Sequence, residues 1–203
     1  MANRIVGLKN IHIAKKTATG TYATPVKLEG AKTFNTTNEV SESSFYSDDV
    51  MDYYSKNITS MELEIELAYL KPEIDSLISG KEYINGVLLS GANDEAGEFA
   101  IMYEMATLKE PIRRVIYCSV LSKDEQSSST KTDSVEEQLV KLTGKAKPDE
   151  DGIFDAVLDK NNIPTGQETK FNAIWDNFFD TVQTPTVIKT KSTAKYTVND
   201  NLK

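Results

Sequence analysis

The residues best suited to chemistry in this chain are few, and their spacing supports no familiar reaction. Its 203 residues include one histidine, His12, and one cysteine, Cys118. His12 lies between Ile11 and Ile13, which predicts a surface or packed position on a short strand and not a base in a catalytic triad. Cys118 ends an apolar run, where a thiol behaves as a small hydrophobe. One cysteine cannot form an internal disulfide, and one histidine cannot supply a histidine-rich metal site.

Motifs for phosphate, nucleotide or catalytic metal binding do not occur in the sequence. Residues 143–145 (Thr-Gly-Lys) lack the upstream glycine of a phosphate-binding loop, and no dinucleotide fingerprint, nucleophile elbow or zinc-protease signature is present. Two acidic clusters are candidates for a divalent cation, Asp48 with Asp49 and Asp52, and the run at 149–152. We interpret both as solvated loop carboxylates. The sequence therefore predicts a protein that is not an enzyme and that needs no cofactor and no metal.

The charge of the chain argues against a surface that grips nucleic acid throughout. With 23 basic and 31 acidic side chains, the formal net charge is −8. Residues 1–32 carry six basic groups and one acidic group, whereas residues 33–110 carry 4 basic and 16 acidic groups. A basic end and an acidic middle suit an oligomer in which one copy meets the flank of another. No apolar run approaches the roughly 18 residues of a membrane span, so we expect no membrane partner.

The clearest periodic pattern lies at residues 61–67, where four apolar side chains alternate with three glutamates: Glu62, Glu64 and Glu66. Period two predicts a strand with one apolar and one acidic face. Residues 72–79 follow, with proline at the first position and Gly80 as a stop signal. We expect a short helix there, packed on the apolar face of the strand.

Residues 33–60 are polar and carry aromatic side chains at four places: Phe45, Tyr46, Tyr53 and Tyr54. A connection of this length is unlike a plain surface loop. It predicts either an extended hairpin or an arm that becomes ordered on another chain.

The remaining patterns predict further strands at residues 4–14, 26–31, 99–105, 112–121 and 134–142, a tight turn at 85–86 and a serine-rich loop at 123–132. Thr165 and Glu168 match a capping box for a second helix, whose aromatic core face is formed by Phe171, Ile174, Trp175 and Phe178. Beyond Pro185, β-like residues predict an added strand or a loose extension over 185–203. The total is seven or eight strands and two helices, a mainly β (α+β) fold in one domain over residues 1–184.

Ten short segments follow one another in order along the chain: residues 7–10, 22–26, 30–31, 46–49, 62–67, 72–74, 85–87, 130–136, 142–144 and 175–179. In this order the chain resembles the major tail proteins (tail tube proteins) of long-tailed bacteriophages, over roughly residues 5 to 182. Residues 113–114 (Arg-Arg), the stretch 46–60 and the tail beyond residue 184 depart from the family pattern.

The resemblance implies a β-sandwich or barrel flanked by a helix, which forms hexameric rings whose inner sheets join into one closed barrel. Rings stack into a hollow tube around a tape measure protein, with tail terminator and distal tail proteins as further partners. Genomic DNA passes through the lumen without specific binding. The implied location is the virion tail, assembled in the cytoplasm of the host bacterium.

From this resemblance we expect Glu62, Glu64 and Glu66 to face the lumen, where carboxylates repel phosphates over about 10 Å. We also expect an inter-ring arm with these contact residues: Phe45, Tyr46, Asp48, Asp49, Tyr53 and Tyr54. The alternatives are an outer, solvated position for the acidic face, a tube subunit of a contractile tail or phage-derived bacteriocin, and a non-viral β-sandwich binding module.

Overall fold

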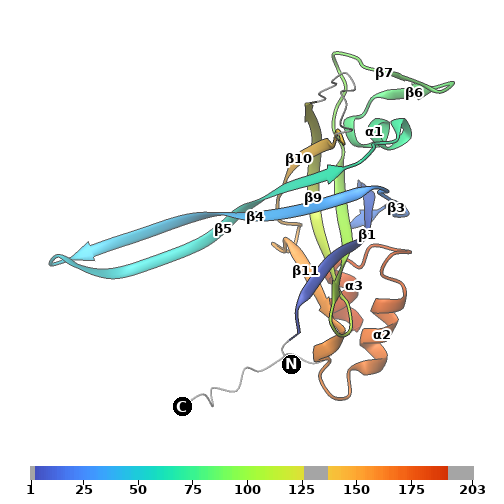
Figure 1. Cartoon of the computed structure of the whole chain (residues 1–203). Helices are drawn as coiled ribbons and strands as arrows, with labels where there is room; N and C mark the ends of the chain where they lie inside the picture. The colour runs from blue at the N-terminus through green and yellow to red at the C-terminus, as the bar shows by residue number, and fades with distance from the viewer. Residues whose placement is uncertain (1–2, 126–136, 192–203) are drawn as a thin grey trace.

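In the computed structural model, which describes residues 3–125 and 137–191, one large antiparallel sheet organises the chain (Figure 1). Its strands lie in the order β2 (Thr21–Tyr22), β1 (Ile5–Ala18), β8 (Glu98–Thr107), β9 (Ile112–Glu125), β10 (Val140–Ala146), β5 (Val50–Leu67) and β4 (Ala31–Ser47). Two further strands pair off this path, β3 (Val26–Lys27) with β1 and β11 (Asp155–Asp159) with β9. The predicted mainly β (α+β) class is confirmed.

Three helices and a small hairpin complete the described part of the chain. Helix α1 (Pro72–Ser79) precedes the hairpin of β6 (Glu82–Ile84) and β7 (Val87–Leu89), whose turn is the predicted Asn-Gly pair. A 3-10 turn (Lys160–Asn162) follows β11, and α2 (Glu168–Asp176) and α3 (Pro185–Lys191) come last. None of the described helices has the length and apolar character needed to cross a bilayer.

The sheet has a hydrophobic core on each face. Alternate residues of β1, β5, β8, β9 and β10 enclose one core, which α1 covers through Ile74 and Ile78. On the opposite face, residues of β1, β8, β9 and β11 pack against Ile174, Trp175 and Phe178 from α2 and the turn after it. The predicted aromatic core face is thereby confirmed, although Phe178 lies just beyond the end of α2.

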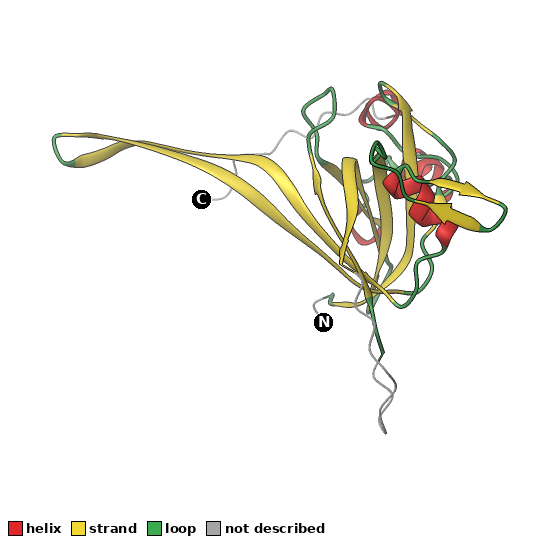
Figure 2. Cartoon of the chain, turned by 90° about the horizontal axis from the view of Figure 1, so that it is seen from above, coloured by secondary structure: helices red, strands yellow, loops and turns green. Residues whose placement is uncertain are grey.

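The stretch 33–60 is an extended hairpin, the first of the two predicted alternatives. β4 and β5 stay paired from Ala31 opposite Leu67 to Ser47 opposite Val50. Asp48 and Asp49 form the turn, both in the left-handed region with φ of 50° and 62°. Seen in two views, the outer part of this hairpin projects from the body on the side away from the helices (Figures 1 and 2).

The other end of β5 has the predicted two-sided pattern. The four apolar residues at 61–67 are at most 2% exposed, and the glutamates point to the opposite face. α1 begins at Pro72 and ends at Gly80 in the left-handed conformation, as predicted. The same apolar face and α1 belong to one core, as expected.

Several predicted boundaries are wrong. β10 begins at Val140 and continues through Gly144 to Ala146, β9 continues into the predicted serine-rich loop as far as Glu125, and β11 was not predicted. Residues 126–136, which include the rest of that loop and the whole segment 130–136 used for the resemblance, lie outside the described residues. In all, the described chain has eleven strands rather than seven or eight.

Both predictions about the C-terminal part need correction. The capping box does not form. Gly166 makes a turn with φ of 82°, so Glu168 is the first helical residue and not the third. The N-cap residue is Gln167, whose side chain makes no capping hydrogen bond. Residues after Thr184 form helix α3 instead of a strand, since Pro185 suits a first helical turn and Ile188 packs on the second core. Residues 192–203 lie outside the described part.

Candidate functional site

The side chains with catalytic potential are placed in structural roles. The Nδ1 atom of His12 lies 2.9 Å from the carbonyl oxygen of Asn10, and its ring lies 4.7 Å from that of Phe179. Cys118 is buried at 1% exposure, in agreement with the predicted small-hydrophobe role. Within residues 3–125 and 137–191, no group of three or more histidine, cysteine or acidic side chains is arranged to hold a metal ion.

Cys118 has polar neighbours that the sequence did not indicate. Its φ of 47° marks a bulge in β9, so that Tyr117 and Cys118 both join the second core. The Sγ atom lies 3.2 Å from Nζ of Lys16, which also binds Glu150 at 2.6 Å. The hydrogen bond from Lys16 to Glu150 raises the pKa of Lys16, so this group remains an ammonium and links β1 to the loop after β10.

The two acidic clusters serve the backbone. Asp48 and Asp49 form the hairpin turn, and Asp52 accepts a hydrogen bond from the hydroxyl of Ser47 at 2.5 Å. Asp149 accepts hydrogen bonds from the backbone N–H groups of residues 151 and 153 at 3.0 and 2.8 Å. The bonds to Asp149 are those of an aspartate that stabilises a turn, and Asp48 and Asp49 are residue types that tolerate the left-handed turn conformation.

The acidic face of β5 is less negative than its sequence predicts. Lys141 and Lys145 of the neighbouring β10 point to the same face, where Lys141 binds Glu64 at 2.8 Å and Lys145 lies 3.7 Å from Glu62. Glu66 accepts a hydrogen bond from Thr33 of β4 at 2.8 Å. Lys145 also binds Glu39 of β4 at 2.9 Å. Four carboxylates thus face two ammonium groups, which leaves an excess of two negative charges.

This face is also hollowed. Strands β4, β5, β9 and β10 border a shallow groove of about 580 Å³, which is lined by Asn35, Thr37, Glu62, Leu63, Glu64, Val120, Leu121, Ser122, Thr143, Gly144 and Lys145. Its lining combines charged groups of both signs, such as Glu62 and Lys145, with amide, hydroxyl and apolar side chains. The groove suits a wetted surface better than a specific binding site.

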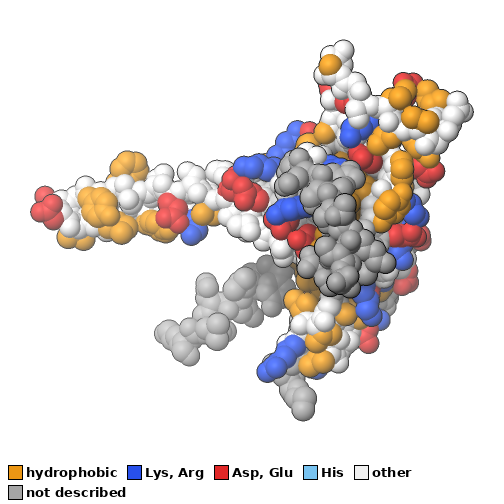
Figure 3. Space-filling view, turned by 45° about the horizontal axis from the view of Figure 1, so that its top comes forward, with side chains coloured by type: hydrophobic (Ala, Val, Ile, Leu, Met, Phe, Trp, Pro, Cys, Tyr) orange, Lys and Arg blue, Asp and Glu red, His pale blue; other side chains and the backbone are white. Residues whose placement is uncertain are grey.

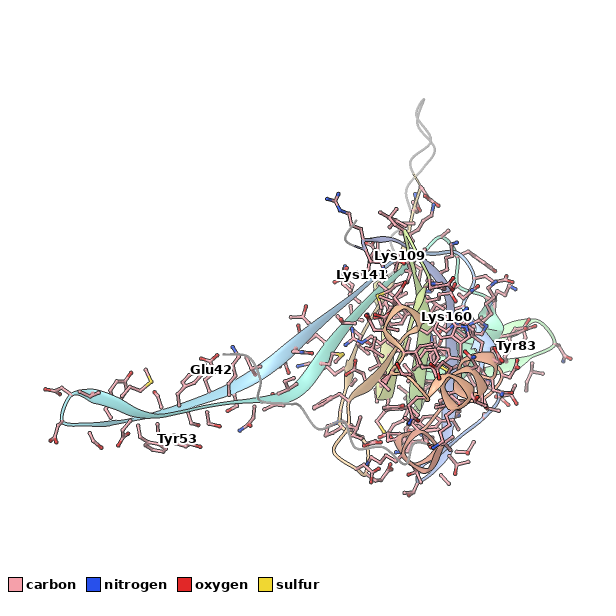
Figure 4. All side chains as sticks on the ribbon, turned by 90° about the horizontal axis from the view of Figure 1, so that it is seen from below. Glu42, Tyr53, Tyr83, Lys109, Lys141 and Lys160 are labelled. Carbon is pink, nitrogen blue, oxygen red and sulfur yellow. The ribbon has the colours of Figure 1, made fainter. Side chains whose placement is uncertain are left out.

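The outer half of the β4–β5 hairpin, residues 39–60, has the opposite character, and we call it the arm. Six large apolar side chains near its end are between 50% and 66% exposed: Phe45, Tyr46, Val50, Met51, Tyr53 and Tyr54. Phe45 and Tyr53 pair across the strands with ring centroids 5.5 Å apart. Apolar side chains recur along the arm in Figure 3, and Figure 4 places Tyr53 and Glu42 on it.

Such an arm is incomplete on its own. A two-stranded hairpin without a covering layer is marginally stable in water, and exposed apolar patches mark interaction sites. Ion pairing along it is limited among the described residues to Glu42 with Lys56, at 2.7 Å, beyond the contact of Glu39 with β10. The six contact residues predicted for the arm therefore lie together at its outer end.

The sheet also has open edges. Among the described strands, β4 pairs with β5 alone, and β1 has a partner on only one side over residues 5–10. Unpaired strand edges are templates for pairing with another chain.

One pair of structural residues was missed by sequence reasoning. Arg113 stacks on Trp175 at 4.0 Å and donates to its carbonyl oxygen at 2.6 Å, which fastens α2 to the sheet. Arg114 binds Asp155 at 2.6 Å and reaches Thr36 of β4 at 3.3 Å. No local pattern signals these partners, since they lie 41 to 78 residues away.

No protein-family model matches this chain, and a search of curated proteins finds no match either. The likeness to tail tube proteins therefore depends on the ordered segments in the sequence alone.

Proposed function

We propose that this chain is the structural subunit of a bacteriophage tail tube, assembling into hexameric rings that stack into a conduit for the genome. The observation that carries this proposal is the arm, a long hairpin that projects away from the body (Figure 1) and has six exposed apolar side chains. A second copy of the chain is the partner that would bury them in every subunit of a regular assembly.

Two further features support the proposal. The open edges of β1 and β4 give each subunit two sites where a neighbouring sheet can continue its own. The groove over β4, β5, β9 and β10 carries a small excess of negative charge. A conduit for DNA needs such a surface, because bound phosphates would stop transit. The tape measure, terminator and distal tail proteins are the partners that this role requires.

The proposal is tested by shortening the arm. Deleting residues 45–55 joins Ser44 to Lys56 and retains the Glu42–Lys56 pair at a new tight turn. The variant should keep the melting temperature of the full chain, because neither hydrophobic core includes a residue of the deleted segment 45–55. Electron microscopy at high concentration should reveal tubes or rings for the full chain and none for the variant. Normal tubes from the variant would refute the role of the arm.

We further propose that Glu62, Glu64 and Glu66 line the lumen. Glu64→Cys in assembled tubes should react slowly with bulky maleimides, whereas Glu168→Cys on α2 should react at the rate of the disassembled protein. Cys118 gives little background because it is buried. Equal rates at both positions would place the acidic face outside.

A further inference from the structure

The end of the arm carries acidic charge as well as apolar surface. Asp48 and Asp49 at the turn have no cation within 4.0 Å among the described residues, and Asp52 contacts only the hydroxyl of Ser47. These three carboxylates stand beside the six exposed apolar side chains of the arm. A partner for this surface must therefore offer apolar side chains and positive charge together.

One place on the body has that combination. The start of β1 lies beside the turn between β8 and β9, because Ile5 pairs with Thr107 and the N–H of Leu108 donates to the carbonyl of Arg4 at 3.1 Å. Ile5, Val6 and Leu108 are each 60% exposed.

Arg4 and Lys109 are the chain neighbours of Ile5 and Leu108, and Lys9 lies four residues further along β1, opposite Glu104. None of the three has a carboxylate within 4.0 Å in the described part of the chain. The nearby Glu110 is already bound to Lys160 at 3.0 Å. We call this surface the basic corner, made of Arg4, Ile5, Val6, Lys9, Leu108 and Lys109.

The arm cannot reach the basic corner of its own chain. From Glu39 opposite Ser60 to Ser47 opposite Val50, nine residues of β4 stay paired with β5, which is about 30 Å of ladder. The ladder holds the arm extended away from the body, and Figure 4 places Lys109 on the body and Tyr53 far out on the arm. An arm that contacts this corner must therefore belong to a second copy.

We infer that the end of the arm of one subunit docks on the basic corner of a neighbouring subunit. This inference rests on the proposed function and names the receptor for the arm. The contact joins two different surfaces of the same chain, so it can repeat from copy to copy around a ring or along a tube. Apolar side chains would supply the buried area, and the three carboxylates facing three cations would fix the register.

The β6–β7 hairpin is the competing receptor, since Ile84, Val87 and Leu89 are 47%, 55% and 50% exposed. Its charge argues against it. Glu82 lies on this hairpin, and the neighbouring Lys81 is engaged with Asp75 of α1 at 3.5 Å. An acidic arm would meet an acidic side chain here, without an available cation in return.

A charge exchange tests the inference. The arm variant carries Asp48→Asn, Asp49→Asn and Asp52→Lys, where asparagine tolerates the left-handed turn. The corner variant carries Arg4→Glu, Lys9→Glu and Lys109→Glu. The control variant carries Lys15→Glu and Lys147→Glu, two exposed cations near the start of β8, at the end of that strand away from the corner.

The critical concentration for assembly is measured by sedimentation in low-salt buffer. Each of the arm and corner variants should raise it by about ten-fold or more. The chain with both sets of changes should recover about three-fold or more of that loss, since the lysine introduced at position 52 faces the glutamates introduced at the corner. The critical concentration of the control variant should equal that of the native chain. At about 1 M salt the critical concentrations of the arm and corner variants should differ less from the native value, because the electrostatic screening length falls to about 3 Å.

Failure of this inference differs from failure of the proposed function. If the native chain assembles and loses assembly on arm deletion, but the combined variant is not rescued, the basic corner is not the receptor. Assembly blocked by Ile84→Asp with Val87→Asp, and not by the corner variant, would assign the receptor to β6–β7 and overturn the inference. A native chain that never assembles would end the proposed function itself.

Discussion

Removing one exposed tyrosine from the arm should weaken assembly without weakening the fold. Tyr46 and Tyr69 form a matched pair for this test, because they are 64% and 63% exposed but only Tyr46 lies on the arm. Tyr46→Ala removes a side chain that the proposed assembly buries. Tyr69→Ala removes the same side chain from the connection between β5 and α1.

The size of the effect follows from the exposed area. A tyrosine side chain buries about 150–250 Å² when fully covered, so roughly two thirds of that, about 130 Å², remains to be buried at Tyr46. At about 25 cal/mol per Å² this amounts to about 3 kcal/mol for each docked arm. That energy corresponds to a loss of about 150-fold in the association constant. Unfolding should change by no more than about 0.5 kcal/mol in either variant, as at other surface positions.

The assay is the critical concentration for tube or ring formation, followed by light scattering and electron microscopy, with urea unfolding of the unassembled chain as the stability measurement. Tyr46→Ala should assemble only at much higher concentration, and Tyr69→Ala should match the native chain. Equal losses in both variants, or none in Tyr46→Ala, would refute the reasoning that the arm is a buried contact.

Three other predictions concern the fold. Arg113→Ala should lower the free energy of unfolding by about 2–4 kcal/mol in urea titrations, because it removes both the stacking on Trp175 and the hydrogen bond to its carbonyl; an unchanged midpoint would contradict this role. Gly80→Ala should cost about 2 kcal/mol or more, since its φ is 73° and a methyl group would clash with the carbonyl of Glu95; a gain in melting temperature would count against the geometry. Burial raises the pKa of Tyr117, so the unfolded chain loses its phenol proton first and stability should fall as the pH rises above about 10. Tyr117→Phe should flatten that dependence, and an equally steep profile in the variant would exclude this tyrosine as its source.

The parts of the fold that were predictable from sequence are those with a local physical signature. The alternation at 61–67 is readable because one face of β5 is buried and the other is not, and Pro72 and Gly80 mark both ends of α1. The arm had no such signature. Both of its faces are exposed, so its apolar residues do not alternate with polar ones along the sequence. Its length and its aromatic side chains indicated a hairpin or arm without selecting between them.

The errors have equally specific causes. Gly144 looks like a strand end, but its missing side chain lets β10 approach the backbone of Val120 in β9, so the strand continues through it. In α3, β-branched residues favour a strand, yet the proline at the first turn and the packing of Ile188 on the second core outweigh that preference. Lys145 pairs with Glu39 and Glu62 only because β10 lies next to β5, a neighbour relation that no local pattern contains. The mixed charge of the proposed lumen face could therefore not be foreseen.

The central claim, that this chain completes itself by assembling with its own copies, is tested most directly by cryo-electron microscopy of the purified full chain over a range of concentrations. The account predicts hollow rings or tubes with six subunits per ring, in which density for the arm of each subunit runs onto an adjacent copy. A chain that stays monomeric at every concentration, with the arm free in solvent, would contradict it.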